Sequence, residues 1–435
     1  MSSITIKELD ATSGGGRATA LDVVFVPGFP GAKVDEANFP GKFIPTLCST
    51  IQEFTTYFGT GPSKIVVGKD DSQNDITEDD KSYVYAQNII SLGLPVLYMS
   101  VTDAVPKATE LSVANFNTQI GSALDSTKKS LGLDLSDKGE HQFKYLTSGG
   151  YANVLLGDKS EDNSIASAMA KLASTRGDCV ALIDHPDNPS VKLSGDTSYF
   201  EGLKKFASGS STTAHYCAAF TPWININYGR EDKTANQCIS MPPSYGYLTA
   251  LATSIKTNAS WLAVAGAARG QVPNLYSNEP LHLDSTNRLT NYIAETLYQA
   301  RDKVSINAIT NIKPFGYRIW GNRTLKDNAS EGNLTATSFL NIRNMISDVK
   351  KVVYDACKKY TFEQYNDVLW LNFKAYIEPT LDKMKTGAGL SGYKIIQQPT
   401  TEKAKLVATI KLYPLYAVED FEISVEMLDD EVKVS

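Results

Sequence analysis

Apolar positions along most of the chain follow two alternating periods. Apolar runs of strand length occur at 21–30, 95–101, 179–183 and 213–220, and the first of them ends at a Pro-Gly pair. Between such runs, apolar residues recur at the spacing of one helical face, most clearly at 164–176. Strands that alternate with helices in this way predict an α/β core.

The same criteria assign the other segments of this part of the chain. They predict helices at 53–58, 81–92, 113–131, 197–207, 246–256, 259–269 and 287–300, strands at 143–146, 305–309 and 315–320, and an acidic surface loop at 70–81. The pattern is weakest at 103–150, so that stretch is the least completely assigned part of the core.

One long amphipathic helix dominates the C-terminal part of the chain. Between 338 and 360, apolar residues recur at helical spacing: Phe339, Ile342, Ile346, Val349, Val353 and Ala356. A second helix is predicted at 367–380, followed by a short segment at 381–385 and a glycine turn at 387–392. Two strand patterns, at 393–397 and 406–412, then predict a hairpin.

Both ends of the chain carry an isolated strand pattern. Near the start, Ile4 and Ile6 alternate with polar residues, and the glycines at 14–16 follow as a break. Near the end, apolar residues again alternate with polar ones: Phe421, Ile423 and Val425 against Glu422, Ser424 and Glu426. Since a lone strand is not stable in water, each must pair with the edge of a sheet. The alternative for the first segment is a disordered terminus.

Composition narrows the class of protein. The chain has 435 residues, which suggests two or three domains, and its 42% hydrophobic and 21% charged residues are ordinary for a globular protein. A net charge of -6 argues against broad nucleic-acid binding, which needs a basic surface. The longest apolar window, 261–268, is far shorter than the roughly 20 residues of a membrane span. Residues 1–10 lack a signal-peptide pattern, so we expect a cytoplasmic protein.

No local motif predicts catalysis or metal binding. The five cysteines are dispersed, as expected for reduced thiols, and no hydrolase, phosphate-loop or dinucleotide-binding motif is present. The glycines at 387, 389 and 392 have dinucleotide-like spacing but precede a strand, so they indicate a turn. The best candidate for an enzyme or ligand site is Asp184-His185, because strand carboxyl ends carry ligand sites in open α/β sheets. The alternative is a loop that caps the strand.

The segment Lys313–Leu325 carries the most specific pattern in the chain. An isoleucine-rich strand leads into Gly316, then into an Arg-apolar-Trp-Gly unit formed by Arg318, Trp320 and Gly321, and then into Arg323-Thr-Leu. This order resembles a signature of contractile tail sheath proteins, the outer sleeve of contractile phage tails and related injection machines. The resemblance implies that Arg318 and Arg323 are buried or interface ion-pair donors, not catalytic residues.

Further segments between 255 and 428 are similar to the same family. They include 260–269, the helix start 339–346 with Asn344 in place of a common second arginine, 362–367 with Gln364 and Tyr365 in place of the usual proline, and the turn 387–392. The patterns at 40–59 and at Ile183-Asp184 fit loosely, and 103–150 shows little similarity.

The resemblance implies an α/β (α+β mixed) fold, with mixed sheets flanked by helices and with extended strand arms. It divides the chain into an N-terminal arm and linker at 1–20, an α/β core with an outward-facing domain at 21–304, an inner, tube-facing domain at 305–415 and a C-terminal arm at 416–435. The arms would join sheets of neighbouring subunits. The residues implied in this strand exchange are Ile4, Ile6, Phe421, Ile423 and Val425, with Gly14, Gly15, Gly16 and Leu415–Glu419 as linkers.

The function implied by the resemblance is structural, not enzymatic. Such a subunit polymerises around a tail tube in the virion, after assembly in the host cytoplasm, and contracts to drive the tube through the target cell envelope. The implied partners are further copies of the chain, the tube protein, and baseplate and tail terminator proteins. No cofactor, metal, catalytic residue, direct nucleic-acid contact or membrane insertion is expected.

A basic row on the long helix is the candidate contact with the tube. It consists of Lys350, Lys351, Lys358 and Lys359. A solvated helix end explains these residues equally well, since cations are favourable there. The resemblance leaves open whether the sleeve belongs to a phage tail, a bacteriocin or a secretion machine. The alternatives to it are the enzyme at Asp184-His185 and a different self-assembling protein, such as a capsid or tube component.

Overall fold

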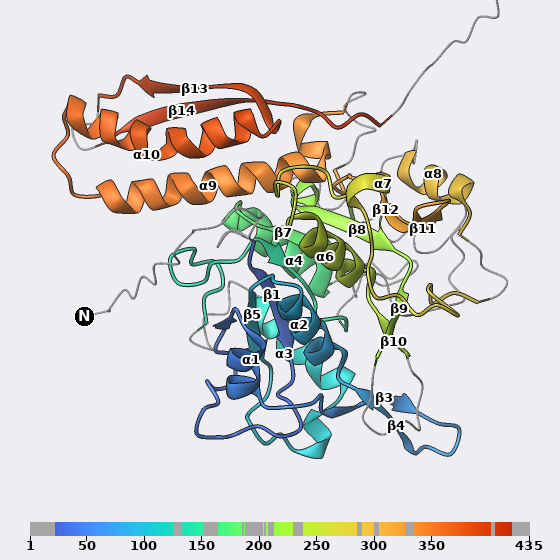
Figure 1. The fold of residues 1–435 in the computed structure, drawn as a ribbon. Helices are drawn as coiled ribbons and strands as arrows, with labels where there is room; N and C mark the ends of the chain where they lie inside the picture. Colours follow the sequence, from blue (N-terminus) through green and yellow to red (C-terminus); the bar gives the residue numbers. More distant parts are fainter. Residues whose placement is uncertain are drawn as a thin grey trace, which may run out of the picture.

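The computed structural model describes most of the chain between residues 22 and 419 and is drawn in Figure 1. The described residues are 22–124, 133–151, 164–184, 187, 203, 206–207, 213–228, 238–284, 289–299, 304–326, 334–401 and 405–419. Both predicted arm strands, the glycine linker, His185 and nearly all of the helix predicted at 197–207 lie outside these residues.

An eight-stranded sheet organises the described part of the body. Its order is β12-β11-β8-β7-β6-β1-β5-β2. The six strands from β11 to β5 run parallel, and β12 and β2 are antiparallel edges. Their bounds are β1 Val24–Gly28, β2 Thr46–Cys48, β5 Val96–Ser100, β6 Tyr145–Leu146, β7 Val180–Ile183, β8 Cys217–Thr221, β11 Asn307–Ile312 and β12 Gly316–Trp320. The predicted α/β fold is confirmed.

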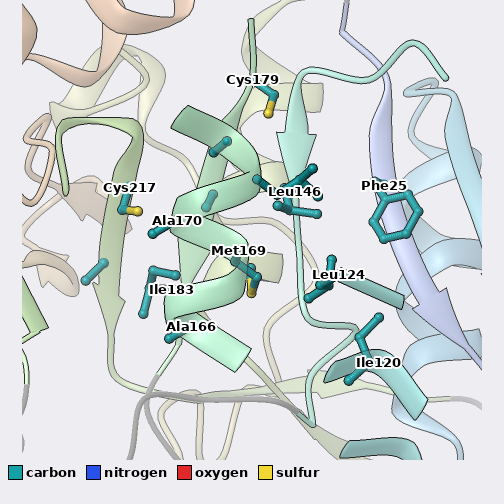
Figure 2. Packing of buried hydrophobic residues seen from close by; sticks show 14 of the residues in the cluster. Phe25, Ile120, Leu124, Leu146, Ala166, Met169, Ala170, Cys179, Ile183 and Cys217 are labelled. Carbon is teal, nitrogen blue, oxygen red and sulfur yellow. The ribbon is translucent and has the colours of Figure 1, made fainter. Parts of the chain in front are cut away.

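Helices cover both faces of this sheet, which explains why its central strands are apolar without alternation. On β1, Phe25 belongs to one buried cluster and Val24 and Val26 to the other. The first cluster packs under α3 (Val113–Leu124), α4 (Ser164–Arg176) and α8 (Asn291–Gln299), and the second under α1 (Ile51–Phe58), α2 (Lys81–Ser91) and α6 (Pro243–Ser254). Figure 2 shows α4 lying across the first face, with Met169 and Ala170 among the strand side chains.

A separate layer lies beyond the edge of this body (Figure 1). It consists of α9 (Leu340–Tyr360), α10 (Asp367–Thr386) and a hairpin of β13 (Leu390–Gln398) and β14 (Val407–Pro414), which share a third apolar cluster. Trp261 joins this layer to the body: its ring lies against Gly387 and Gly389, and its Nε1 donates a hydrogen bond of 2.9 Å to the Gly387 carbonyl. We call α9, α10, β13 and β14 the C-terminal layer.

Smaller elements complete the described chain. They are the hairpins β3 (Lys64–Lys69) with β4 (Asp75–Asp79) and β9 (Ile224–Asn227) with β10 (Cys238–Met241), the short helix α7 (Gly266–Arg269), and 3-10 turns at Ala108–Glu110, Ala214–Tyr216 and Ala336–Ser338.

Four expectations are corrected by the structure. The helix predicted at 259–269 is mostly turn, because Ala265 is extended and Gly266 has a φ of 72°, so only α7 forms. The segment 70–81 is not simply a surface loop: it contains β4, and Asp80 is fully buried as the N-cap of α2. The second C-terminal helix does not end at residue 380: it continues through the segment 381–385, so that α10 is one helix from Asp367 to Thr386.

The fourth correction concerns the domain boundary placed between residues 304 and 305. That point does not separate two units, because β11 pairs with β8 and carries β12 as the edge of the main sheet. The separate layer starts instead near Leu340, where α9 begins.

Replacing Trp261 tests how the C-terminal layer is held. Trp261→Ala should lower the free energy of unfolding by about 3–5 kcal/mol, because it removes a large buried ring. Trp261→Phe keeps most of the packing and should lose much less. Denaturant titration of the full chain measures both. Equal midpoints for wild type and Trp261→Ala would show that the ring does not hold the layer.

Candidate functional site

Asp184, the carboxylate of the alternative enzyme or ligand site, is buried against the start of a helix. It follows β7 and is 1% exposed. Its two oxygens accept hydrogen bonds from the Ser244 backbone N–H at 2.8 Å and the Ser244 hydroxyl at 2.7 Å, in the first turn of α6. Burial raises the pKa of Asp184 to about 7, although the Ser244 bonds oppose the shift. The carboxylate therefore satisfies donors at the start of a buried helix, which is a different role from the strand-capping loop given as the alternative.

The pH dependence of stability follows from this burial. Since the folded pKa of Asp184 is raised above that of an unfolded aspartate, its protonated form favours folding, and that contribution is lost as pH rises from about 4 towards 7. Asp184→Asn should therefore flatten the fall in stability over this range. Denaturant titrations at several pH values measure the slope, and an unchanged slope would contradict a buried Asp184.

A second polar cluster lies beyond the same strand end, and no local pattern in the sequence predicts it. Asp187 is 2.6 Å from His282 Nδ1 and 2.9 Å from Lys81 Nζ, and it accepts a hydrogen bond of 2.8 Å from the Ser240 hydroxyl. Despite burial, the His282 hydrogen bond and the Lys81 charge hold the pKa of Asp187 below its usual range. These groups form hydrogen bonds and ion pairs with one another, and these bonds connect α2, β10 and the loop before His282. Within the described residues, no cluster of three or more His, Cys, Asp or Glu could hold a metal ion.

The structure brings together the motif residues around the edge hairpin β11–β12. Gly316 has a φ of 81° and opens β12, and Arg318 donates hydrogen bonds to the carbonyls of Ala267 (3.2 Å) and Tyr317 (3.0 Å). Trp320 packs against the first buried cluster. Gly321 is needed for close approach, because a Cβ there would lie 2.6 Å from Asn307 Oδ1.

The same approach positions Arg323. Asn307 accepts a hydrogen bond of 2.8 Å from the Arg323 backbone N–H and donates one of 2.9 Å to its carbonyl. The Arg323 guanidinium is then held over Phe339, with its central carbon 4.5 Å from the ring centroid. The motif glycine and Asn307 therefore fix where one nearly buried cation points.

Arg323 anchors the beginning of the C-terminal arm. Its guanidinium forms an ion pair with Glu419, and Tyr298 bonds both of them through its hydroxyl. Two further contacts hold the preceding residues: Tyr416 packs edge-on against Phe339 at 5.1 Å, and the Leu415 N–H donates 3.0 Å to the Gly389 carbonyl. The predicted C-terminal linker, Leu415–Glu419, is thus held at three of its residues, beside a cavity of about 250 Å³, while Val418 between them is exposed.

A buried ion triad anchors the other end of the described chain. Lys144, just before β6, lies 2.8 Å from Asp22 and 2.8 Å from Asp348 of α9, and all three residues are at most 2% exposed. Burial alone would lower the pKa of Lys144, but the two carboxylates hold it above its usual range. The chain therefore enters β1 from a fixed point on α9.

Both anchors converge on α9. Asp348 belongs to the N-terminal triad, and Phe339, the N-cap residue of α9, lies under Arg323 and Tyr416. Nine positions separate the two residues, which corresponds to about 14 Å of helix. One rigid element thus fixes both points at which the arms leave the described body.

The predicted basic row is divided by the structure. Lys350, Lys358 and Lys359 are exposed, but Lys351 is buried. Its Nζ donates 2.7 Å to the Phe143 carbonyl and lies 3.4 Å from Asp178. Neighbouring positions on a helix point in different directions, so Lys350 and Lys351 do not share a surface. Lys351 belongs to the contact between α9 and the sheet and is not part of a surface row.

A double-mutant cycle tests the C-terminal anchor. Arg323→Met, Glu419→Gln and the double variant should show a coupling energy of about 1–3 kcal/mol, because the two groups share one nearly buried network. Denaturant titration of the full chain gives the three values. Additive single effects would mean that the ion pair does not hold the arm.

The comparisons with known proteins agree on one fold. No protein-family model matches the chain. Over 288 residues the chain is 22% identical to the tail sheath protein of Vibrio phage KVP40, covering 62% of this chain and 40% of that protein. The chain therefore spans well under half the length of this curated relative.

Solved structures match nearly the whole chain. The PVC sheath complex of an extracellular contractile injection system, in its contracted state, aligns with a TM-score of 0.57 at 15% identity over 99% of this chain and 98% of the other. The contracted baseplate of the anti-feeding prophage aligns with a TM-score of 0.60 at 16% identity over 99% and 98%. The resemblance to contractile sheath proteins is thereby confirmed at the level of the fold. Among the described residues, no helix is long and apolar enough to cross a membrane.

Proposed function

We propose that this chain is the structural subunit of a contractile sheath, which polymerises around a tail tube and contracts to drive the tube through a target cell envelope. The observation that carries the proposal is the fold match to the PVC sheath complex over 99% of the chain. The phage tail sheath relative supports the same role. The proposed function is common to phage tails and to other contractile injection systems.

The arms supply the proposed connections between subunits. Ile4 and Ile6, and on the C-terminal side Phe421, Ile423 and Val425, would bury alternate side chains in the sheets of neighbouring copies. The β13–β14 hairpin offers a place for them: among the described residues it is a two-stranded sheet, so each strand has an edge without a partner strand. Gly14, Gly15 and Gly16 would allow the N-terminal arm to turn.

The exposed lysines of α9 are the proposed grip on the tube. Lys358 and Lys359 lie at the end of the helix and Lys350 lies further back. Such exposed charges give weak, salt-sensitive contacts, which suit a tube that must be released. Baseplate and tail terminator proteins are the further proposed partners, in a virion tail assembled in the host cytoplasm. The role is structural and not enzymatic, in keeping with Asp184 as a helix cap.

Negative-stain electron microscopy of the purified chain tests the proposal. Wild-type protein should form helical tubes, alone or with its tube protein, over a range of salt and concentration. A chain lacking residues 2–16 should not form them, and neither should a chain that ends at Glu419, because each lacks one exchanged strand. A chain that ends at Met427 is the matched control and should still assemble, since it keeps Phe421, Ile423 and Val425. Tubes from both shortened chains, or none from wild type with its tube protein, would overturn the proposal.

A further inference from the structure

Arg343 on α9 is a buried cation with no carboxylate partner in the described part of the chain. It is 3% exposed, and among the described residues its charge interacts with Tyr216 and with no carboxylate. Its guanidinium carbon lies 4.4 Å from the Tyr216 ring centroid, and its Nε has no hydrogen-bond partner. The Tyr216 side chain interacts with this guanidinium, but a buried guanidinium with no carboxylate among the described residues is unfavourable, so its position fits an anionic group that arrives from elsewhere.

The surroundings of Arg343 are also cationic. Lys350 is exposed and lies beside the same ring, with its Nζ 3.4 Å from the Tyr216 hydroxyl. The pKa of His215 is sensitive to these charges: burial, and then the charges of Arg343, Lys326 and Lys350, lower it to about 4. The imidazole is therefore neutral at pH 7, and the area keeps a net positive charge. We call Arg343, Lys350, His215 and Tyr216 the Tyr216 patch.

The C-terminal arm leaves the body close to this patch. Glu419 is held by Arg323, Arg323 lies over Phe339, and the Phe339 carbonyl accepts a 3.0 Å hydrogen bond from the Arg343 backbone N–H. One helical turn therefore separates the anchor from Arg343. Three further residues in extended form reach about 10 Å, which is enough to cover that distance.

The arm that follows Glu419 has the complementary charge. Residues 420–426 contain three carboxylates, Asp420, Glu422 and Glu426, and no cation. With an alternating strand pattern they lie on one side and Phe421, Ile423 and Val425 on the other. The acidic side fits a cationic surface, whereas the apolar side fits a sheet.

We propose that the acidic side of residues 420–426 docks on the Tyr216 patch of its own subunit before assembly. The inference rests on the proposed function, because it concerns how the same arm is held until a neighbouring copy offers a strand edge. Docking gives Arg343 its missing anion and keeps the arm beside its anchor. Exchange then replaces these charge contacts with backbone hydrogen bonds in the neighbour, and salt favours the exchange because it screens the docked state.

Zero-length carbodiimide cross-linking of the full-length chain tests this docking directly. The reagent joins an amine and a carboxylate only where the two are in contact. In dilute, unassembled protein, mass spectrometry should find Lys350 joined to Asp420, Glu422 or Glu426. Lys385, an exposed lysine of α10, is the matched control and should not be joined to them. Mixing unlabelled and 15N-labelled chains shows whether each link lies within one chain.

Two variants make the result specific. Arg343→Met should reduce the yield of the Lys350 link by about fivefold or more, since it removes the buried charge. Asp420→Asn with Glu422→Gln and Glu426→Gln should abolish it, and this variant leaves the described core unchanged. Absence of the link in folded wild-type protein, an unchanged yield in Arg343→Met, or links only between different chains would each overturn docking on the same subunit. Tubes seen by microscopy despite such a result would leave the sheath proposal standing.

Discussion

The architecture depends on the buried ion pairs that Lys144 forms with two aspartates. The Lys144 ammonium group lies fully buried between Asp22, which leads into β1, and Asp348, which belongs to α9. Removing one member of such a buried set leaves an uncompensated charge, at a cost of about 3–5 kcal/mol. Lys351 of α9 bonds to Phe143 and Asp178 nearby, and these bonds strengthen the attachment of α9 to the sheet. Polar bonds with fixed directions therefore set the position of α9 on the sheet more closely than apolar packing alone could.

This arrangement matters because α9 also serves the other end of the chain. Phe339, at its start, packs under Arg323 and Tyr416, which hold the C-terminal linker. In a subunit joined to its neighbours by two arms, the anchors of both arms would thus be attached to a single helix, α9. In a sleeve that changes shape while its subunits remain connected, such a helix keeps the two arm anchors at a constant separation.

The parallel core could be predicted from the sequence because strands buried on both faces are uninterrupted apolar runs. Strand β7 is predicted for this reason, and helix α4 is predicted from apolar residues at the spacing of one helical face. Strand β2 has only three residues and no readable pattern. The small apolar residues at 259–269 suggested a helix, although Trp261 there packs under the C-terminal layer and Gly266 breaks the helix. The motif at 313–325 indicated the family, but its use as an arm anchor depends on Glu419, which is 96 residues from Arg323. The Lys144 triad spans separations of 122 and 204 residues, which no local pattern records.

The most direct test of the account is a cryo-EM reconstruction of the polymer formed by this chain, with its tube protein if assembly needs it. The account predicts strands at Ile4–Ile6 and Phe421–Val425 paired with the β13–β14 hairpins of neighbouring subunits. It also predicts that Asp22 remains on Lys144 and Glu419 on Arg323 in every subunit. A polymer whose arms stay on their own subunits, or whose contacts do not involve the arms, would contradict it.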